Sequence, residues 1–315
     1  MAALHGISKA MIPPPKWLDP EERYLVGISG GRDSIALHHW LVENGFHKII
    51  YCHLNHELRE NESDDDEKFL RNLLGKDLIV GRVNVAKMAR RENLSLETAA
   101  REARHRFFQK CATQTEINHI LLAHHADDQA ETVLFNLLRG AAGLKGMKTR
   151  QELGPLTFLR PFLEVRRKTI NQYLSNLNHS FRDDSSNLEP FATRNRLRNE
   201  VIPLLSDIMK RDITTNILRA SDHHRELENA ADIYLSGVEI LDPQGRIHLP
   251  TLRSLPQALQ KRSIHQFLSS HQIPNLTSAH IDQALTITNP DASPSMNLPG
   301  GQRLRRKEAR LFISS

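Results

Sequence analysis

The stretch YLVGISGGRDSIALHHW, residues 24–40, constrains the fold more than any other part of this sequence. Its first apolar run is typical of a buried strand, and the pattern that resumes at Ile35 is typical of a helix. Between them, SGGRDS contains two adjacent glycines, which reach backbone angles closed to other residues and have no side chain to block a ligand. Such a turn aims several N–H groups at one point beside a helix N-terminus. We therefore predict a phosphate-binding turn, with Ser29 and Ser34 adding hydroxyl groups; the alternative is a tight turn with glycines for steric reasons only.

The same alternation of strand and helix continues along the first half of the chain. Short β-rich runs alternate with helical patterns, the runs being YLVGIS, KIIYCHL, DLIVGRVNV and NHILLAH. This order predicts an α/β fold with a Rossmann-like parallel sheet and helices on both faces. Ligands of such sheets bind at the carboxyl ends of the strands, where the polar residues of this chain also fall.

The length of 315 residues is enough for two domains of ordinary size. We expect a flexible N-terminal leader over 1–20, an α/β catalytic domain with a helical extension over 21–212, and a smaller α+β C-terminal domain over 213–315. The last segment, SMNLPGGQRLRRKEARLFIS, contains two short runs that are able to pair as a hairpin.

The cysteine content and the charge of the chain indicate its compartment and the kind of partner that it binds. The two cysteines, Cys52 and Cys111, are not in a CxxC pair, which argues against a disulfide framework or a structural zinc site and suits a reducing cytoplasm. No secretory signal is recognised, and no run approaches the ~18 apolar residues of a membrane span. The net charge is +5, and VRRKT, TRNRLRNE and RLRRKEAR are local basic clusters, which favour a polyanionic partner and no membrane.

The glycine turn differs from two familiar phosphate-binding motifs, since neither G-x-x-x-x-G-K-[ST] nor G-x-G-x-x-G is present. Asp33 would repel a phosphate unless a divalent cation bridged them, so we predict Mg²⁺ there. The pattern resembles the PP-loop of ATP pyrophosphatases, which cleave ATP between the α and β phosphates and adenylate a carbonyl oxygen. The resemblance implies that ATP contacts the turn residues Ser29, Gly30, Gly31, Arg32, Asp33 and Ser34.

Further segments narrow the resemblance. Four further segments, in this order, resemble the tRNA(Ile)-lysidine synthetase family. They are HLNHELRENE, ETAAREARHRFF, LLAHHADDQAETVLFNLLRGAAGLKGM and RDDSSNLEPFATRNRLRNEVIPLL. That family adenylates the ring carbonyl at position 2 of the wobble cytidine in a CAU-anticodon isoleucine tRNA, with release of pyrophosphate. Free lysine then displaces AMP and leaves lysidine. The implied partners are ATP, Mg²⁺, L-lysine and this tRNA, and a homodimer is left open.

Two residues are candidates for catalysis beside Asp33. Arg104 is expected in the middle of the apolar face of its helix, where it meets either an anionic α-phosphate or a structural ion-pair partner. Asp128 follows a strand, where it is able to bind Mg²⁺ or to receive a proton from lysine. Its alternative is helix capping, because Asp128 and Glu131 have capping-box spacing. Asp127 is the weaker candidate for these roles.

Other polar residues are predicted to bind nucleotide or RNA. His53 and Asn55, with His56 and Arg59, follow the second strand near the expected adenosine pocket, or are structural polar residues. Arg194, Asn195 and Arg198 contact RNA, or form an ion-pair network on a helix. Phosphate contacts in the C-terminal domain are assigned to Arg305 and Arg306.

Three other functions compete with this interpretation. A PP-loop tRNA thiolase needs cysteines near its site, and the spacing of the two cysteines does not suit one. An ammonia-using amidating enzyme needs a glutaminase partner or domain, which nothing here resembles. A non-catalytic RNA-binding module would not need Asp33, Arg104 and Asp128.

Overall fold

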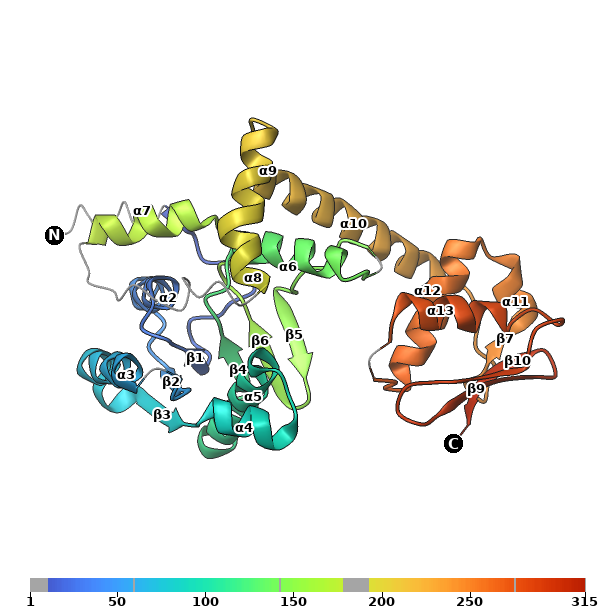
Figure 1. Cartoon of the computed structure of the whole chain (residues 1–315), viewed down its shortest axis with the longest axis horizontal. Coiled ribbons are helices and arrows are strands. Elements are labelled where there is room, and N and C mark those ends of the chain that lie inside the picture. Colours follow the sequence, from blue (N-terminus) through green and yellow to red (C-terminus); the bar gives the residue numbers. More distant parts are fainter. Residues whose placement is uncertain (1–10, 59, 142, 178–192, 275, 315) are drawn as a thin grey trace. The chain divides into compact units, whose positions relative to one another are not determined.

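The computed structural model describes residues 11–58, 60–141, 143–177, 193–274 and 276–314. The chain divides into two compact units. The first runs to Thr132 and continues from Gly146 to Thr215, and the second comprises Val133–Lys145 and Asn216 onward. A six-stranded sheet belongs to the first unit and a four-stranded sheet to the second (Figure 1).

The six-stranded sheet has the strand order β3-β2-β1-β4-β6-β5. Its strands are β1 (Tyr24–Gly27), β2 (Ile49–Asn55), β3 (Leu78–Arg82), β4 (His119–Leu121), β5 (Arg150–Leu153) and β6 (Leu156–Leu159). All neighbours pair in parallel except β5, which pairs antiparallel with β6. The predicted parallel α/β sheet is confirmed, and the antiparallel edge strand β5 is an addition to it.

Helices cover both faces of this sheet. They are α2 (Arg32–Glu43), α3 (Glu60–Leu74), α4 (Val85–Glu92), α5 (Leu96–Thr115), α6 (Ala126–Leu138) and α7 (Arg167–Leu177). Alternate residues of β1 point to opposite faces. Tyr24 and Val26 join a core with buried residues of α2, α3 and α7. Leu25 joins a second core with α5, so the apolar strand is buried from both sides.

The strand order indicates which edge of the sheet is able to bind a ligand. From β1 the chain crosses to β2 on one side, and β4 later pairs on the other side of β1. The segments that follow β1 and β4 therefore begin next to each other at the carboxyl edge. This is the topological switch point at which ligands of open α/β sheets bind.

After α7, the described chain continues as helices. These are α8 (Thr193–Arg196), a π-helical turn (Leu197–Val201), α9 (Ile202–Ile208) and α10 (Ile213–Ser236). Among the described residues, no helix is long and apolar enough to cross a lipid bilayer.

The second unit has an antiparallel sheet in the order β7-β10-β9-β8, with three further helices. The elements are β7 (Ile247–His248), α11 (Leu249–Ser254), α12 (Gln257–Ser270), α13 (Ser278–Thr286), β8 (Ser295–Asn297), β9 (Arg303–Lys307) and β10 (Arg310–Ser314). Leu304 and Leu311 anchor one face of this sheet in the core. The predicted terminal hairpin is present as β9 and β10, in an α+β arrangement.

Candidate active site

The glycine turn between β1 and α2 has one glycine in a restricted conformation. Gly30 has φ of +84°, in the left-handed region that disfavours side chains. Gly31 has φ of −71° and ψ of 160°, which any residue adopts. Of the two glycines, only Gly30 therefore uses a backbone conformation that is closed to most other residues. Gly31 is instead the N-cap of α2 and offers no side-chain acceptor, which leaves N–H groups of the first helical turn for a ligand.

The two serines of the turn hold it closed. Ser34 Oγ donates a hydrogen bond to the Gly31 carbonyl (2.9 Å) and accepts one from the Ser29 backbone N–H (3.2 Å). Ser34 is buried, while Ser29 is exposed. The structure therefore gives Ser34 a role in the shape of the turn and leaves Ser29 facing solvent.

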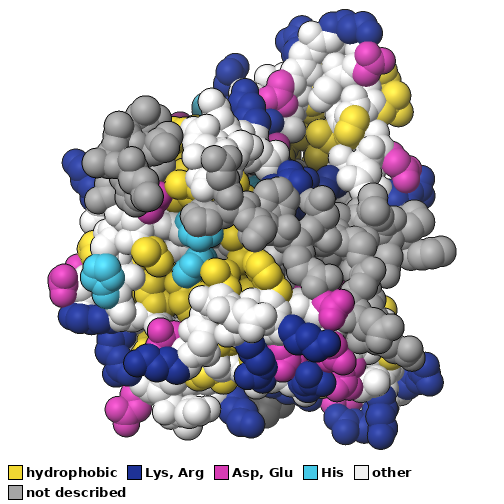
Figure 2. Space-filling view, turned by 90° about the vertical axis from the view of Figure 1, so that its left-hand side faces the viewer, with side chains coloured by type: hydrophobic (Ala, Val, Ile, Leu, Met, Phe, Trp, Pro, Cys, Tyr) yellow, Lys and Arg dark blue, Asp and Glu magenta, His cyan; other side chains and the backbone are white. Residues whose placement is uncertain are grey.

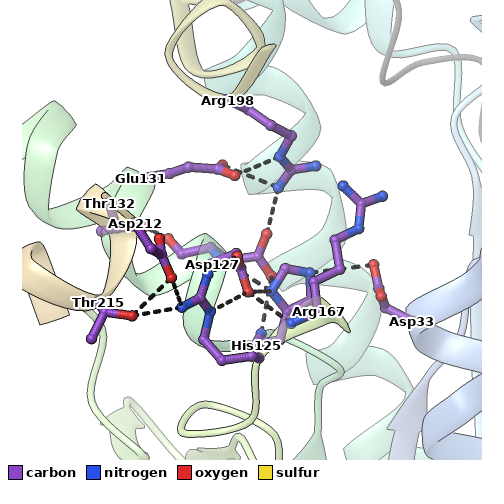
Figure 3. A network of polar contacts seen from close by, with 11 residues as sticks. Asp33, His125, Asp127, Glu131, Thr132, Arg167, Arg198, Asp212 and Thr215 are labelled. Atoms are coloured by element: carbon purple, nitrogen blue, oxygen red, sulfur yellow. Dashed lines mark hydrogen bonds and ion pairs between the residues drawn. The ribbon is translucent and has the colours of Figure 1, made fainter. Parts of the chain in front are cut away.

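His125 connects the glycine turn to the start of α6. Its Nε2 lies 3.5 Å from Asp33 Oδ2, and its Nδ1 lies 3.5 Å from Asp128 Oδ2 (Figure 3). The His125 side chain is fully buried, whereas the two carboxylates keep 29% and 20% of their exposure. The ring thus lies between Asp33, the predicted Mg²⁺ ligand, and Asp128, which was predicted either to bind Mg²⁺ or to accept a proton.

Neighbouring charged groups shift the pKa values of His125 and Asp33. Burial lowers the pKa of His125, but the close contact with Asp33 and the charges of Asp128 and Asp127 outweigh it and raise the pKa above its usual value. Burial raises the pKa of Asp33, and His125, Arg167 and Arg198 more than offset this, so that the Asp33 pKa is lowered. These opposite pKa shifts of His125 and Asp33 favour an ion pair between the two side chains.

Asp128 is the third residue of α6 and not its N-cap. Its carboxylate accepts a hydrogen bond from the His125 backbone N–H at 3.0 Å. The predicted capping box of Asp128 with Glu131 is therefore wrong, because the helix begins at Ala126 and Glu131 is held elsewhere. Asp128 does take part in helix capping, but as the residue that accepts a hydrogen bond from the N-cap residue His125.

Arg198, which was assigned to RNA, is bound to two carboxylates of the site. Its guanidinium lies 2.5 Å from both Asp128 Oδ1 and Glu131 Oε1 (Figure 3). Glu131 keeps 7% of its side-chain exposure, and burial raises its pKa although Arg198 opposes this. These contacts favour the alternative role of Arg198, an ion-pair network, over contact with RNA.

Asp127 belongs to a separate anchoring network. It accepts hydrogen bonds from the Arg167 backbone N–H (2.7 Å) and from the Arg166 guanidinium (3.1 and 3.3 Å). Arg166 also binds Asp212 at 2.6 Å. Asp127 therefore holds the start of α7 and the start of α10 against α6, which explains why it is the weaker candidate for metal or base.

Arg104 does not lie on the buried face of its helix. The buried face of α5 is made of Ala99, Ala103, Phe107, Phe108, Cys111 and Ala112, whereas the Arg104 side chain is accessible to solvent. The protein around Arg104 nevertheless desolvates its guanidinium and lowers its pKa. Arg104 forms no ion pair or hydrogen bond with any residue in the described part of the chain, so the structural ion-pair alternative finds no partner. The pKa values of His56 and His124 are lowered to about 4, chiefly by burial and in smaller part by the charge of Arg104. Arg104 therefore lies close enough to both rings for its charge to act on them.

His53, Asn55 and Arg32 are held mainly by the protein. His53 Nδ1 bonds to the Ile28 carbonyl (3.0 Å), and its buried Nε2 has no partner among the described residues. Asn55 accepts from the Glu57 backbone N–H (2.9 Å) and donates to Asp64 (3.2 Å). Arg32 donates to Asn171 of α7 (3.2 Å). Of the three, His53 retains a nitrogen for a ligand. Arg59 lies outside the described residues.

The remaining predicted RNA contacts have mixed environments. Arg194 Nε lies 3.6 Å from Glu97, and Asn195 is half-buried. Arg306 donates to the carbonyls of Pro290 (2.9 Å) and Ala292 (2.8 Å), whereas Arg305 is exposed. Arg306 is therefore explained by the packing of its own unit. Figure 2 shows that lysine and arginine on one face of the molecule are interspersed with aspartate and glutamate, so net charge alone does not mark the RNA surface.

The donor set fits a metal held jointly with a ligand. Among the described residues no group of three or more His, Cys, Asp or Glu is arranged to hold a metal. Asp33 Oδ1 is buried and accepts no hydrogen bond within the described residues. Mg²⁺ commonly binds one or two carboxylates and completes its shell with substrate phosphates and water. Asp33 fits this pattern.

Two residues of the candidate site, His125 and Arg167, were not predicted from the sequence. Arg167 extends toward Asp33 in Figure 3, and its charge lowers the Asp33 pKa. His125 stands in HHADDQAET, in the loop between β4 and α6, and that position was itself a signal. Because β4 pairs in parallel with β1, polar residues that follow β4 lie at the same edge of the sheet as the glycine turn that follows β1.

Comparison with known proteins agrees with this geometry. Residues 6–205 match the family model of the PP-loop domain, and residues 247–312 match that of the TilS substrate binding domain. A tRNA(Ile)-lysidine synthase of Chlorobaculum tepidum is 34% identical over 259 residues, which cover 78% of this chain and 76% of that protein. The chain belongs to the tRNA(Ile)-lysidine synthase family. The resemblance predicted from the sequence is thereby confirmed.

The chain spans about half to two thirds of the length of two further relatives. The Bacteroides thetaiotaomicron protein is 34% identical over 82% of this chain, but the match spans 62% of that protein. The Clostridium tetani protein is 35% identical over 64% of this chain, and the match spans 44% of that protein. A solved structure, the U34-tRNA thiolase NcsA from Methanococcus maripaludis with its [4Fe-4S] cluster, aligns with a TM-score of 0.53 at 12% identity, covering 70% of this chain and 78% of that one. That likeness shows the shared fold alone.

Proposed function

We propose that the protein ligates lysine to the wobble cytidine of an isoleucine tRNA with a CAU anticodon, at the expense of ATP. The ring carbonyl oxygen at position 2 attacks the α-phosphate of ATP, and pyrophosphate leaves. The lysine ε-amine then bonds to the ring carbon, and AMP leaves with the former carbonyl oxygen. Family membership and the matched substrate binding domain support this assignment.

One observation carries the proposal: the glycine turn, Asp33, His125 and Asp128 converge at the carboxyl edge of β1 and β4. The turn offers the N-terminus of α2 to the phosphates of ATP. Asp33 Oδ1 would hold Mg²⁺ against the pyrophosphate portion. When bound, the cation would neutralise negative charge on the leaving pyrophosphate. His125 fixes the position of the Asp33 carboxylate.

Arg104 and Asp128 receive separate roles. The Arg104 guanidinium has no partner within the described protein, so we assign it to the α-phosphate and to the adenylated intermediate. Asp128 lies on the far side of His125 from Asp33, a position that suits a second ligand better than the same metal. We therefore assign Asp128 to the lysine amine, whose proton it receives as the C–N bond forms.

RNA binding by the second unit is assigned to the solvent face of β9. Arg303, Arg305 and Lys307 alternate with the buried Leu304 and are all exposed. Arg305 pairs in register with Phe312 of β10, which places an aromatic ring on the same face. Cations around an aromatic side chain are typical of single-stranded or loop RNA binding.

Pyrophosphate release is the experiment that tests the function. With ATP and the tRNA, release is expected without lysine, and AMP and lysidine are expected only after lysine is added; nucleoside mass spectrometry identifies the product. Sulfur in the product, or no pyrophosphate, would refute the proposal. The cysteines already disfavour a thiolase, because Cys52 and Cys111 are 2% and 1% exposed in the core.

A further inference from the structure

A groove of about 590 Å³ lies between β3, α4 and α5, away from the residues assigned above. We call it the α4–α5 groove. Its apolar lining includes Leu54, Ile79, Met88, Phe107 and Cys111. Its basic lining consists of Arg82, Lys87, Arg91, Arg106 and Lys110. β3 is an edge strand of the sheet, so no further strand of the described chain pairs with it on this side.

The charge of the groove is one-sided. None of its lining residues is acidic, and five are basic. The three arginines share carboxylates outside the groove: Arg82 binds Glu67 at 2.8 Å, and Arg91 and Arg106 bind Glu92 at 2.8 and 3.0 Å. Lys87 and Lys110 are exposed and form no ion pair with any residue in the described ranges. Their charge is available to an anion.

Close packing of Phe107 on β3 makes the floor of the groove apolar. A Cβ atom added to Gly81 would lie 2.6 Å from the Phe107 ring, so this ring packs directly on the backbone of β3. Any side chain at position 81 would displace the ring. The combination of an apolar floor with cations at the rim fits a flat heterocycle that carries a phosphate, and the volume is typical of sites for small organic groups.

The position of α5 links the groove to the reaction site. Ala103, Arg106, Phe107 and Lys110 of α5 line the groove, while Arg104 of the same helix acts on His56 and His124. β3 is separated from β1 only by β2, a distance of about 10 Å between strand axes. A single-stranded segment that crosses α5 would reach both places.

We propose that the α4–α5 groove holds an unpaired nucleotide of the RNA substrate close to the one that reacts. Its base lies against the apolar floor and its phosphate between Lys87 and Lys110. This inference rests on the proposed function and adds a binding site to it. An acidic peptide that extends the sheet at β3 is the competing occupant.

The double variant Lys87→Ala/Lys110→Ala tests the groove in the whole protein. Binding of a CAU-anticodon tRNA transcript is measured over a range of salt concentrations. We expect about tenfold weaker binding at low salt and a salt slope reduced by about 0.7 for each phosphate interaction that the variant removes. The thermal midpoint is expected to stay unchanged, since neither lysine pairs within the described protein. Lys16→Ala/Lys76→Ala removes two exposed lysines elsewhere and is the matched control.

The outcomes separate the inference from the proposed function. Unchanged tRNA affinity and slope in the groove variant would overturn the inference. Loss of binding to poly-glutamate, with tRNA binding retained, would assign the groove to an acidic protein partner and also overturn it. Pyrophosphate release by the unmodified protein reports on the function independently, because it needs no comparison of variants.

Discussion

His125 and Asp33 meet across the boundary between β4 and β1, with Nε2 of the imidazole 3.5 Å from Oδ2 of the carboxylate. The contact joins the segment after β4 to the glycine turn after β1. It leaves Asp33 Oδ1 buried without a hydrogen bond inside the described protein. One oxygen of Asp33 is therefore fixed by the protein, and the other is left for a ligand.

Replacement of Asp33 tests its role with metal and pyrophosphate. Asp33→Asn keeps the shape of the side chain but removes its charge. We expect pyrophosphate release to fall by at least about 10²-fold, the scale of losing one stabilising group in a closed site. Binding of tRNA is expected to stay within about twofold. Turnover close to that of the unmodified protein would remove Asp33 from the assigned role.

Replacement of Arg104 tests whether this residue acts in catalysis or in folding stability. Because the side chain is exposed and has no described partner, Arg104→Ala is expected to keep the thermal midpoint of the protein. Pyrophosphate release is expected to fall by roughly 10²-fold. Arg90→Ala removes an exposed arginine of α4 and serves as control. An Arg104→Ala protein that loses stability and keeps its turnover per folded molecule would support a structural role instead.

Arg198 is expected to stabilise the site. Arg198→Ala leaves Glu131 buried without its cation. We expect a loss of roughly 2 to 3 kcal/mol in the free energy of unfolding, less than for a fully buried pair because Arg198 keeps 21% of its exposure. Urea denaturation measures it. Arg198→Ala/Glu131→Gln should recover most of that loss; no recovery would show that the ion pair is not the cause.

The pH dependence of stability should report on His56 and His124. Both have pKa values lowered to about 4, chiefly by burial. The unfolded chain, with a histidine pKa near 6.5, then binds more protons than the folded one between about pH 6.5 and 4. Stability is therefore lost as pH falls through this window. Titration of both rings by NMR checks the values, and a ring that titrates near 6.5 would contradict the prediction.

The solvent face of β9 should contribute to tRNA affinity. Arg303→Ala/Arg305→Ala is expected to weaken tRNA binding and to reduce the salt slope by about 0.7 to 0.9 for each phosphate interaction that is removed, with ATP binding intact. Arg306→Ala, on the neighbouring position, removes hydrogen bonds to Pro290 and Ala292. It is expected to lower stability and leave the salt slope unchanged. The reverse pattern would place the RNA contact on Arg306.

The fold and the phosphate turn follow from local patterns. Apolar runs of strand length between amphipathic helices indicate a parallel α/β sheet because burial on both faces demands them. The glycines between β1 and α2 mark the phosphate site because Gly30 adopts a positive φ and Gly31 leaves the N-terminus of α2 uncovered. These features lie within a few residues of one another, so the sequence alone determined them.

The partners of the charged side chains were decided only by the tertiary structure. Arg198 reads as a surface cation in TRNRLRNE, yet it binds Asp128 and Glu131 from a π-helical turn that packs beside α6. Arg104 was expected to be buried and is exposed. His125 reaches Asp33 only because β4 pairs with β1. Such contacts join residues distant in the chain, and strand order and helix packing, which no local pattern encodes, determine which charges meet.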